Sequence, residues 1–120
     1  MISIIFSFKT KPGMNLEFLQ TIGSIIVDLR HVEGCENIDF QQDHTDKEQF
    51  TFRMDWVSSQ QIKTLITSKE YDVFEGAMKV LCHAPTVEIN AAEQRKVQIQ
   101  KSEQKEFNVF ERIRSELLHN

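Results

Sequence analysis

Residues 49–56 alternate apolar and polar side chains without a break, and this pattern constrains the fold more than any other feature of the chain. The apolar positions are Phe50, Phe52, Met54 and Trp56, and the polar positions between them are Thr51, Arg53 and Asp55. A period of two is typical of a β-strand that buries one face and exposes the other. We therefore expect a sheet whose apolar face is covered by a second layer.

Three other segments are predicted to be strands: residues 2–8, 37–42 and 86–90. The first places Ile2, Ile4, Phe6 and Phe8 on one face and Ser3, Ile5 and Ser7 on the other. In the second, Ile38 and Phe40 alternate with polar residues, and the third follows Pro85.

Helices are predicted between these strands, with Asn15 as the N-cap of one that runs to about Arg30 and ends before Gly34. Its expected buried stripe is Leu16, Leu19, Ile22, Ile26 and Leu29. A short helix over 60–66 and a helix that opens at Ser68 follow. The predicted fold class is α+β, with the ferredoxin-like order β-α-β-β-α-β, an antiparallel four-stranded sheet and both helical layers on one face.

Charge and length exclude several classes of protein. The 120 residues carry 14 Lys and Arg against 18 Asp and Glu, for a net charge of −4, so general binding to nucleic acid is disfavoured. No apolar run approaches the roughly 20 residues of a membrane span, and the sequence has no signal-like segment. We expect a cytoplasmic protein that does not bind a membrane.

Cysteine and histidine spacing gives no metal or redox motif. Cys35 and Cys82 are too far apart for a CxxC pair and are expected to be buried thiols. His44, with Asp43 and Asp46 nearby, matches no recognised ligand spacing. No metal and no cofactor is expected.

The second face of the predicted sheet is mixed in character. It carries Ile5 and Val57 beside Arg53, Asp55 and other polar residues. Such a face is typical of two sheets that pack together with polar groups near the rim. We therefore expect a homodimer.

Composition changes after residue 90, which divides the chain into a domain over 1–90 and an extension over 91–120. The extension is predicted to be helical, because Phe107, Phe110, Ile113 and Leu117 recur at helical spacing. The helix either docks on its own domain or on the partner subunit, or it binds a groove of another protein.

Five short motifs, in order over about residues 2–90, carry a family resemblance. They are Lys11-Pro12-Gly13, Val32-Glu33-Gly34-Cys35, the strand Phe50 to Trp56 ending in Asp-Trp, Ser68-Lys-Glu-Tyr71, and Ala84-Pro85-Thr86-Val87. The sequence resembles the antibiotic biosynthesis monooxygenase domain, a family with cofactor-free quinol and anthrone monooxygenases and relatives among the haem-degrading enzymes.

The resemblance implies a dimeric α+β barrel, with a pocket in each subunit between sheet and helices. The residues expected to line an apolar pocket for a flat aromatic molecule are Phe6, Phe8, Phe52, Trp56, Leu65, Phe74 and Met78. The alternative is that these side chains only pack together. Trp56 is expected to be a wall or structural anchor rather than a participant in the chemistry.

The chain departs from its relatives where chemistry is expected. Thr64-Leu65 stands where many members have Ala-His. Compared with the haem degraders, Phe6 stands in place of an Asn, Leu65 in place of a Trp and Glu75 in place of the haem-ligating His, so haem degradation is disfavoured. The remaining catalytic candidates are His31 and Thr64. His31 is otherwise a cation at a helix C-terminus, and Thr64 otherwise caps or bonds back to its helix.

Two functions of different classes remain open. The first is an oxidoreductase, a cofactor-independent monooxygenase that acts on a quinol-like or polyketide-type aromatic molecule. The second is a non-catalytic dimeric module that binds a small apolar ligand, or a protein partner through the C-terminal helix.

Overall fold

The computed structural model describes residues 1–91 and 96–99. The elements in chain order are β1 (Ile2–Lys9), α1 (Asn15–Leu29), β2 (Cys35–Gln42), β3 (Gln49–Trp56), α2 (Ser59–Ile66), α3 (Lys69–Leu81), β4 (Thr86–Ala91) and β5 (Lys96–Ile99). None of the described helices is long and apolar enough to cross a bilayer.

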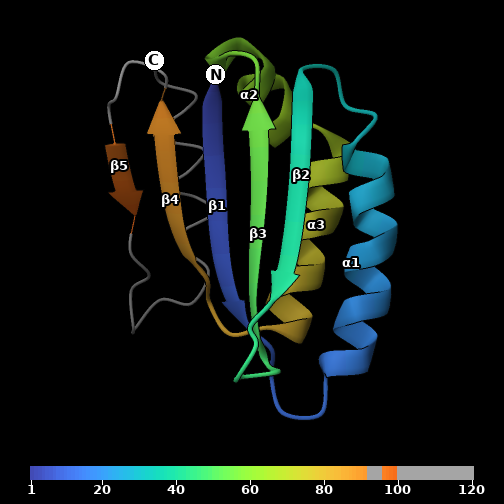
Figure 1. Ribbon diagram of the computed structural model, residues 1–120. Helices are drawn as coiled ribbons and strands as arrows, with labels where there is room; N and C mark the ends of the chain where they lie inside the picture. Colours follow the sequence, from blue (N-terminus) through green and yellow to red (C-terminus); the bar gives the residue numbers. More distant parts are fainter. Residues whose placement is uncertain (92–95, 100–120) are drawn as a thin grey trace.

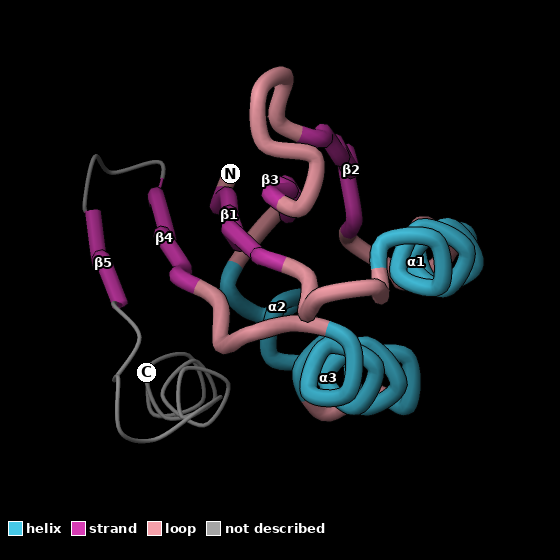
Figure 2. Tube along the Cα trace, turned by 90° about the horizontal axis from the view of Figure 1, so that it is seen from below, coloured by secondary structure: helices cyan, strands magenta, loops and turns pink. Residues whose placement is uncertain are grey.

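One antiparallel sheet, with the strand order β2-β3-β1-β4-β5, forms the frame of the protein. The three helices lie on a single face of it (Figures 1 and 2). The first four strands and the helices have the predicted ferredoxin-like α+β arrangement, so this prediction is confirmed.

The register of β1 against β3 confirms the alternation that the sequence shows. Phe6 pairs with Phe52, and Ile4 pairs with Met54, on the face beneath the helices. Ser3 pairs with Asp55, and Ile5 pairs with Arg53, on the opposite face, which we call the open face. Cross-strand partners share a sheet face, so the apolar set of each strand is buried in one core.

Helix α1 buries a different stripe from the predicted one. Its buried residues are Phe18, Ile22, Ile25 and Leu29. Leu16 and Leu19, which were expected in the core, are 69% and 38% exposed. The helix turns Phe18 inward because this ring packs on Phe50, with 4.7 Å between ring centroids, and an aromatic pair buries more area than a Leu side chain.

Asn15 was predicted to be the N-cap of the first helix, but it is the first residue of α1. Met14 holds the cap position and makes no side-chain hydrogen bond to the helix. The amide of Asn15 instead donates to the backbone oxygen of Lys47 at 2.9 Å, and its oxygen accepts from Thr10. Asn15 therefore ties the start of α1 to the β2–β3 turn. The predicted helix start at Ser68 is confirmed, since Ser68 is the N-cap of α3 and its Oγ accepts from the backbone N–H of Tyr71 at 3.1 Å.

The extension after residue 90 begins with a strand, which corrects the prediction of helix at residues 96–99. Strand β5 pairs with β4, which would otherwise be an edge of the sheet, and Val97 pairs with Ile89. Alternating residues and an open row of hydrogen-bonding groups on β4 favour a strand here. The predicted apolar stripe Phe107, Phe110, Ile113 and Leu117 lies outside the described residues.

A tight turn between α1 and β2 depends on Gly34. Its backbone has φ of +93°, and a Cβ there would clash with Cγ of Gln61 in α2. Its carbonyl oxygen also accepts from the backbone N–H of Val57 at 3.0 Å. Gly13 has a similar φ of +79° but an open surrounding, with no atom within 4 Å of such a Cβ.

Gly34→Ala is expected to lower the free energy of unfolding by about 2–4 kcal/mol, because a side chain adds a clash to an unfavourable backbone conformation. Gly13→Ala is expected to lower the free energy of unfolding by only about 1 kcal/mol, because the backbone conformation is unfavourable for alanine but no clash is added. Urea unfolding of both variants measures the difference, and equal losses would contradict the close approach of Gly34 to α2.

Candidate functional site

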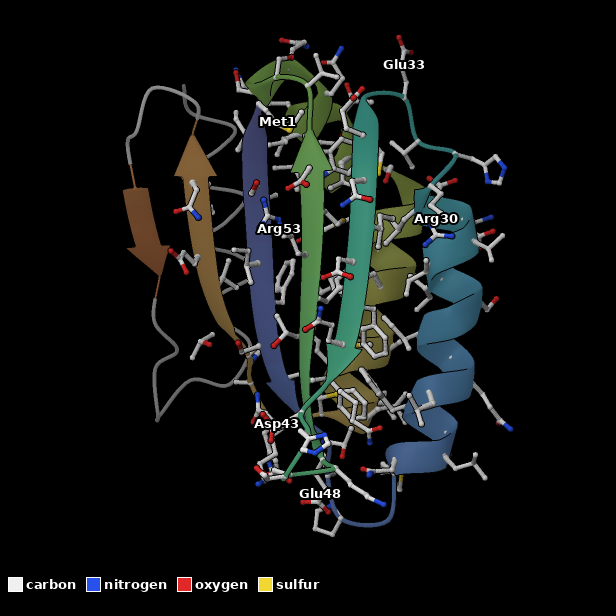
Figure 3. The ribbon with its side chains drawn as sticks, viewed as in Figure 1. Met1, Arg30, Glu33, Asp43, Glu48 and Arg53 are labelled. Atoms are coloured by element: carbon white, nitrogen blue, oxygen red, sulfur yellow. The ribbon has the colours of Figure 1, made fainter. Side chains whose placement is uncertain are left out.

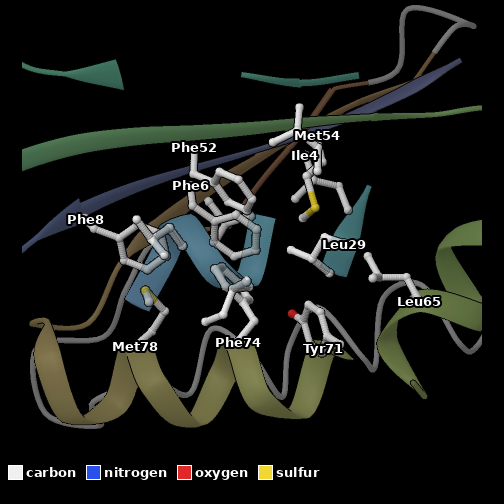
Figure 4. Packing of buried hydrophobic residues seen from close by; sticks show 14 of the residues in the cluster. Ile4, Phe6, Phe8, Leu29, Phe52, Met54, Leu65, Tyr71, Phe74 and Met78 are labelled. Atoms are coloured by element: carbon white, nitrogen blue, oxygen red, sulfur yellow. The ribbon is translucent and has the colours of Figure 1, made fainter. Parts of the chain in front are cut away.

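Four phenylalanine rings meet between the sheet and the helices, and we call them the aromatic cluster. Phe6, Phe8 and Phe52 come from β1 and β3, and Phe74 comes from α3 (Figure 4). The Phe74 ring lies 5.3 Å from Phe6, 5.4 Å from Phe52 and 6.0 Å from Phe8, centroid to centroid. Two of these contacts, those with Phe6 and Phe8, are edge-on, a favourable geometry for aromatic pairs.

The structure brings the other predicted pocket residues into the same core. Met78 lies on α3, Leu65 on α2 and Trp56 at the end of β3. All seven predicted residues have 0% exposed surface. They therefore form a packed apolar core, and their role in binding a ligand stays a prediction.

Trp56 has one feature that the sequence did not show. Its indole Nε1 is buried and has no hydrogen-bond partner among the residues that the structure describes. A buried N–H without a partner typically destabilises a protein by about 1–3 kcal/mol, so few such groups persist. Among the described residues, the Trp56 N–H is thus a buried donor whose hydrogen-bonding capacity is not used.

The two predicted catalytic residues lie elsewhere. His31 is exposed after the end of α1, and its Nδ1 lies 2.8 Å from the carbonyl oxygen of Val27. Thr64 is exposed on α2, and its hydroxyl donates to the carbonyl oxygen of Gln60 at 3.3 Å. Both side chains bond to their own helical segment, and the structure does not bring them into the aromatic cluster.

The cysteines differ in their surroundings. Cys82 is fully buried, and burial raises the pKa of its thiol to about 12, so it is not a thiolate at neutral pH. Cys35, also expected to be buried, is half-buried at the start of β2, because this strand lies at the edge of the sheet. Among residues 1–91 and 96–99, no three His, Cys, Asp or Glu side chains are grouped so that they could hold a metal ion.

A polar network lies on the open face, behind the aromatic cluster. The hydroxyl of Ser3 donates to Oδ1 of Asp55 at 2.6 Å, and Nε of Arg53 donates to the same oxygen at 2.9 Å. Ser3 and Asp55 are only 8% and 7% exposed, whereas Arg53 is exposed at the surface (Figure 3). The sequence placed Asp55 and Arg53 on one face, but only the register of β1 against β3 brings Ser3 to them.

The network keeps Asp55 ionised. Burial disfavours the charged carboxylate, but the hydrogen bonds from Ser3 and Arg53 and the charge of Arg53 outweigh it, so the pKa lies below its ordinary value of 3.8. A carboxylate with a lowered pKa is a weak base. The network therefore ties the end of β3 to β1 at the position next to Trp56.

Asp55→Asn is expected to lower the free energy of unfolding at pH 7 by about 1–2 kcal/mol, because two charge-assisted hydrogen bonds are weakened. A lowered native pKa contributes stability above the unfolded pKa, and this is lost as pH falls below about 4. The difference between the wild type and the variant should therefore shrink from pH 7 to pH 3 in urea unfolding.

Asp39→Asn, on the same face, is the control for Asp55→Asn. Asp39 is exposed and accepts one hydrogen bond from Gln41 at 3.2 Å. Its substitution should therefore change the free energy of unfolding by no more than about 0.5 kcal/mol. If Asp55→Asn lowered the free energy of unfolding equally at pH 7 and pH 3, the role of the carboxylate charge would be contradicted.

Comparison with solved structures places the fold among known proteins. Two proteins assigned to the antibiotic biosynthesis monooxygenases, from Deinococcus radiodurans and Nitrosomonas europaea, superpose with TM-scores of 0.70 and 0.71 at 14% and 12% identity. The first match covers 84% of this chain and 100% of that one, and the second covers 77% and 98%. A protein from Shewanella oneidensis has a TM-score of 0.67 at 20% identity, with 82% and 91% covered. These similarities establish the fold.

Comparison with curated protein sequences finds no match. A sequence model of one family, described as antibiotic biosynthesis monooxygenase, matches residues 1–75 of this chain. The match includes β1, α1, β2, β3 and α2, and it ends within α3 just after Phe74 of the aromatic cluster. The chain therefore belongs to the antibiotic biosynthesis monooxygenase family.

Proposed function

We propose that this protein is a cofactor-independent monooxygenase that acts on a quinol-like or polyketide-type aromatic molecule. The observation that carries the proposal is the buried Trp56 N–H, which has no partner in the described part of the chain and lies in the same core as the aromatic cluster. A flat aromatic substrate matches the apolar, ring-lined surroundings, and its oxygen matches the unused donor. Family membership supports the same class of reaction.

The reaction balances without a resident redox group. A ring carbon that carries two hydrogens, as in an anthrone or in the keto tautomer of a naphthohydroquinone, loses a proton, and the resulting electron-rich anion transfers an electron to dioxygen. The two radicals then join through a new C–O bond, and the hydroperoxide takes up a proton. Loss of water leaves a carbonyl, so CH₂ and O₂ become C=O and H₂O.

The protein contributes positioning, charge stabilisation and exclusion of water. In this proposal the rings of Phe6, Phe52 and Phe74 contact the substrate, and Trp56 Nε1 donates to the oxygen on which the negative charge develops. All of these side chains are fully buried, so the substrate enters only when core side chains move apart. Once the core closes over the substrate, bulk water is excluded from the reactive anion.

Trp56→Phe tests the proposed donor, because it keeps an aromatic ring and removes the N–H. The expected result is a roughly 10- to 100-fold lower kcat/KM for oxygen consumption with an anthrone or a naphthohydroquinone. Oxygen uptake is measured on metal-free protein.

Phe50→Leu is the matched control for Trp56→Phe. Phe50 is equally buried, but its ring packs on Phe18 and Phe40 at 4.7 and 5.4 Å, on the α1 side of the core. This variant should lose stability and keep its kcat/KM. An equal fall in both variants, or no oxygen uptake by the wild type with any substrate of the panel, would argue against the proposal.

A non-catalytic module that binds a small apolar ligand is the second candidate. It is favoured by the positions of His31 and Thr64, which are exposed and hydrogen-bonded to their own helical segments. The chain has a single Trp, so its fluorescence reports on the core directly. A saturable change of Trp56 fluorescence without oxygen uptake would favour this candidate over the first.

We also propose that two copies pack through their open faces as a homodimer. The open face has a half-buried Ile5 between Arg53 and Glu88, and beside it the largely buried carboxylate of Asp55. A self-complementary interface of this kind has a two-fold axis, and opposite charges face each other across it.

Sedimentation equilibrium at micromolar concentration tests the dimer. The wild type is expected to sediment as a dimer and Ile5→Lys as a monomer, because a second cation beside Arg53 would be desolvated in the interface. Leu16→Lys, at a 69% exposed position on α1, is the control and should stay dimeric. A monomeric wild type would rule out the proposal.

A further inference from the structure

A groove lies at the end of the open face where β1 ends and β3 and β4 begin, the lower end of the sheet in Figure 1. Its volume of about 430 Å³ is within the range of small-molecule sites. Ser7 pairs with Thr86, and Lys9 pairs with Gln49, so these side chains come together from three strands. The chain between α3 and β4 completes the groove, whose lining residues are Ser7, Lys9, Gln49, His83, Ala84 and Thr86.

Backbone hydrogen bonds hold the walls of this groove in place. The N–H of His83 donates to the carbonyl oxygen of Lys9 at 2.8 Å, and the N–H of Thr10 donates to the carbonyl oxygen of Glu48 at 2.9 Å. Thr10 also forms an isolated β-bridge with Cys82. The end of β1 is therefore fixed to segments on both of its sides, and a ligand would not have to order the groove when it binds.

The polar lining of the groove consists of hydrogen-bonding groups, and none of its six side chains is acidic. The side chains of Ser7, Gln49, His83 and Thr86 have no hydrogen-bond partner among the residues that the structure describes. They are exposed or half-buried, so each can donate a hydrogen bond to a ligand that displaces water.

Lys9 already holds a carboxylate at this position. Its Nζ donates to Oδ2 of Asp46 at 2.8 Å, and an ammonium group has three N–H donors, so two remain. The two side chains are 48% and 43% exposed, and ion pairs this open to solvent contribute little to stability. A carboxylate from solution can therefore share Lys9 with Asp46 or replace it.

We propose that this groove binds the carboxylate of a small organic acid that has an apolar body. Lys9, Ser7 and Thr86 donate to the carboxylate, and the apolar body contacts Ala84 and the methylene groups of Lys9. A monocarboxylate fits better than a phosphate, because Lys9 is the one lining residue with a fixed positive charge. The inference does not depend on the proposed function.

Benzoate is the probe, and its binding to the full chain is followed by NMR of the backbone amides. Benzoate should shift the signals of Ser7, Thr86 and their neighbours, with a dissociation constant on the order of 1 mM. Benzyl alcohol, which has a similar shape and no charge, should bind about 10-fold more weakly.

Three outcomes of this titration would overturn the proposal. They are equal binding of benzoate and benzyl alcohol, tighter binding of inorganic phosphate than of benzoate, and shifts confined to the core around Trp56. The last result would instead place the probe in the core that the proposed monooxygenase uses, so the two proposals are tested separately.

Thr86→Val and Thr51→Val form a matched pair for the hydroxyl groups. Both threonines are exposed and pair with Ser7 from neighbouring strands, but only Thr86 lines the groove. Valine keeps the shape of threonine and removes the donor. Benzoate should bind about 3- to 10-fold more weakly to Thr86→Val, and its dissociation constant should be unchanged in Thr51→Val. Equal effects in the two variants would contradict the proposed site.

Asp46→Asn tests the competition for Lys9 by a gain of binding. Asparagine removes the charge and keeps the Oδ1 that accepts from the backbone N–H of Glu48 at 3.0 Å. Benzoate should bind about 3- to 10-fold more tightly, because Lys9 loses its internal partner. Asp43→Asn is the control, since Asp43 lies in the same turn but accepts hydrogen bonds from Thr45, and it should leave binding unchanged. Unchanged or weaker binding to Asp46→Asn would contradict the role of Lys9.

Lys9→Gln should lose benzoate binding by about 10-fold or more, because the cation of the groove is removed. Lys47→Gln is the matched control, since Lys47 is exposed in the same turn but does not line the groove. An equal loss in both variants would show that benzoate responds only to the net charge of the chain and would overturn the proposal.

Discussion

The pairing of β1 with strands on both of its sides is the interaction on which the rest of the structure depends. β1 hydrogen-bonds to β3 and to β4, which joins residues from the beginning, middle and end of the described chain. On the helix side this pairing places Phe6 between Phe52 and Val87. The ring of Phe6 then meets Phe74 from α3, so burial of this face attaches the helix layer to the sheet.

The same pairing places an apolar core on one face of the sheet and a polar network on the other. Trp56 points into the apolar core, while its neighbour Asp55 belongs to the polar network with Ser3 and Arg53 on the open face. Adjacent residues of a strand point to opposite faces, so the end of β3 contributes to both regions. On the helix side the Trp56 N–H has no partner among the described residues, whereas on the open face Ser3 and Arg53 donate hydrogen bonds to the Asp55 carboxylate.

Much of the fold was predictable because the signals were local. The alternation over residues 49–56, the helix start at Ser68 and the break at Pro85 each act within a few residues of the chain. The stripe of α1 was not predictable in the same way, because the helix carries two overlapping apolar patterns that share Ile22 and Leu29. Packing of Phe18 on Phe50, a residue far away in the sequence, selects between them. β5 was missed because its strand character depends on the free edge of β4.

By itself, the amino-acid sequence determined the order of the first four strands and of the helices between them, the buried faces of β1 and β3, and the seven apolar residues expected between sheet and helices. These follow from periodicity and from turn residues, which are properties of neighbouring positions. Only the tertiary structure decided that the Trp56 N–H has no described partner, that Ser3 reaches Asp55, and that His31 and Thr64 stay outside the core. The reason is that a hydrogen bond depends on a few ångströms between groups distant in the chain, which strand register and helix packing set and periodicity does not.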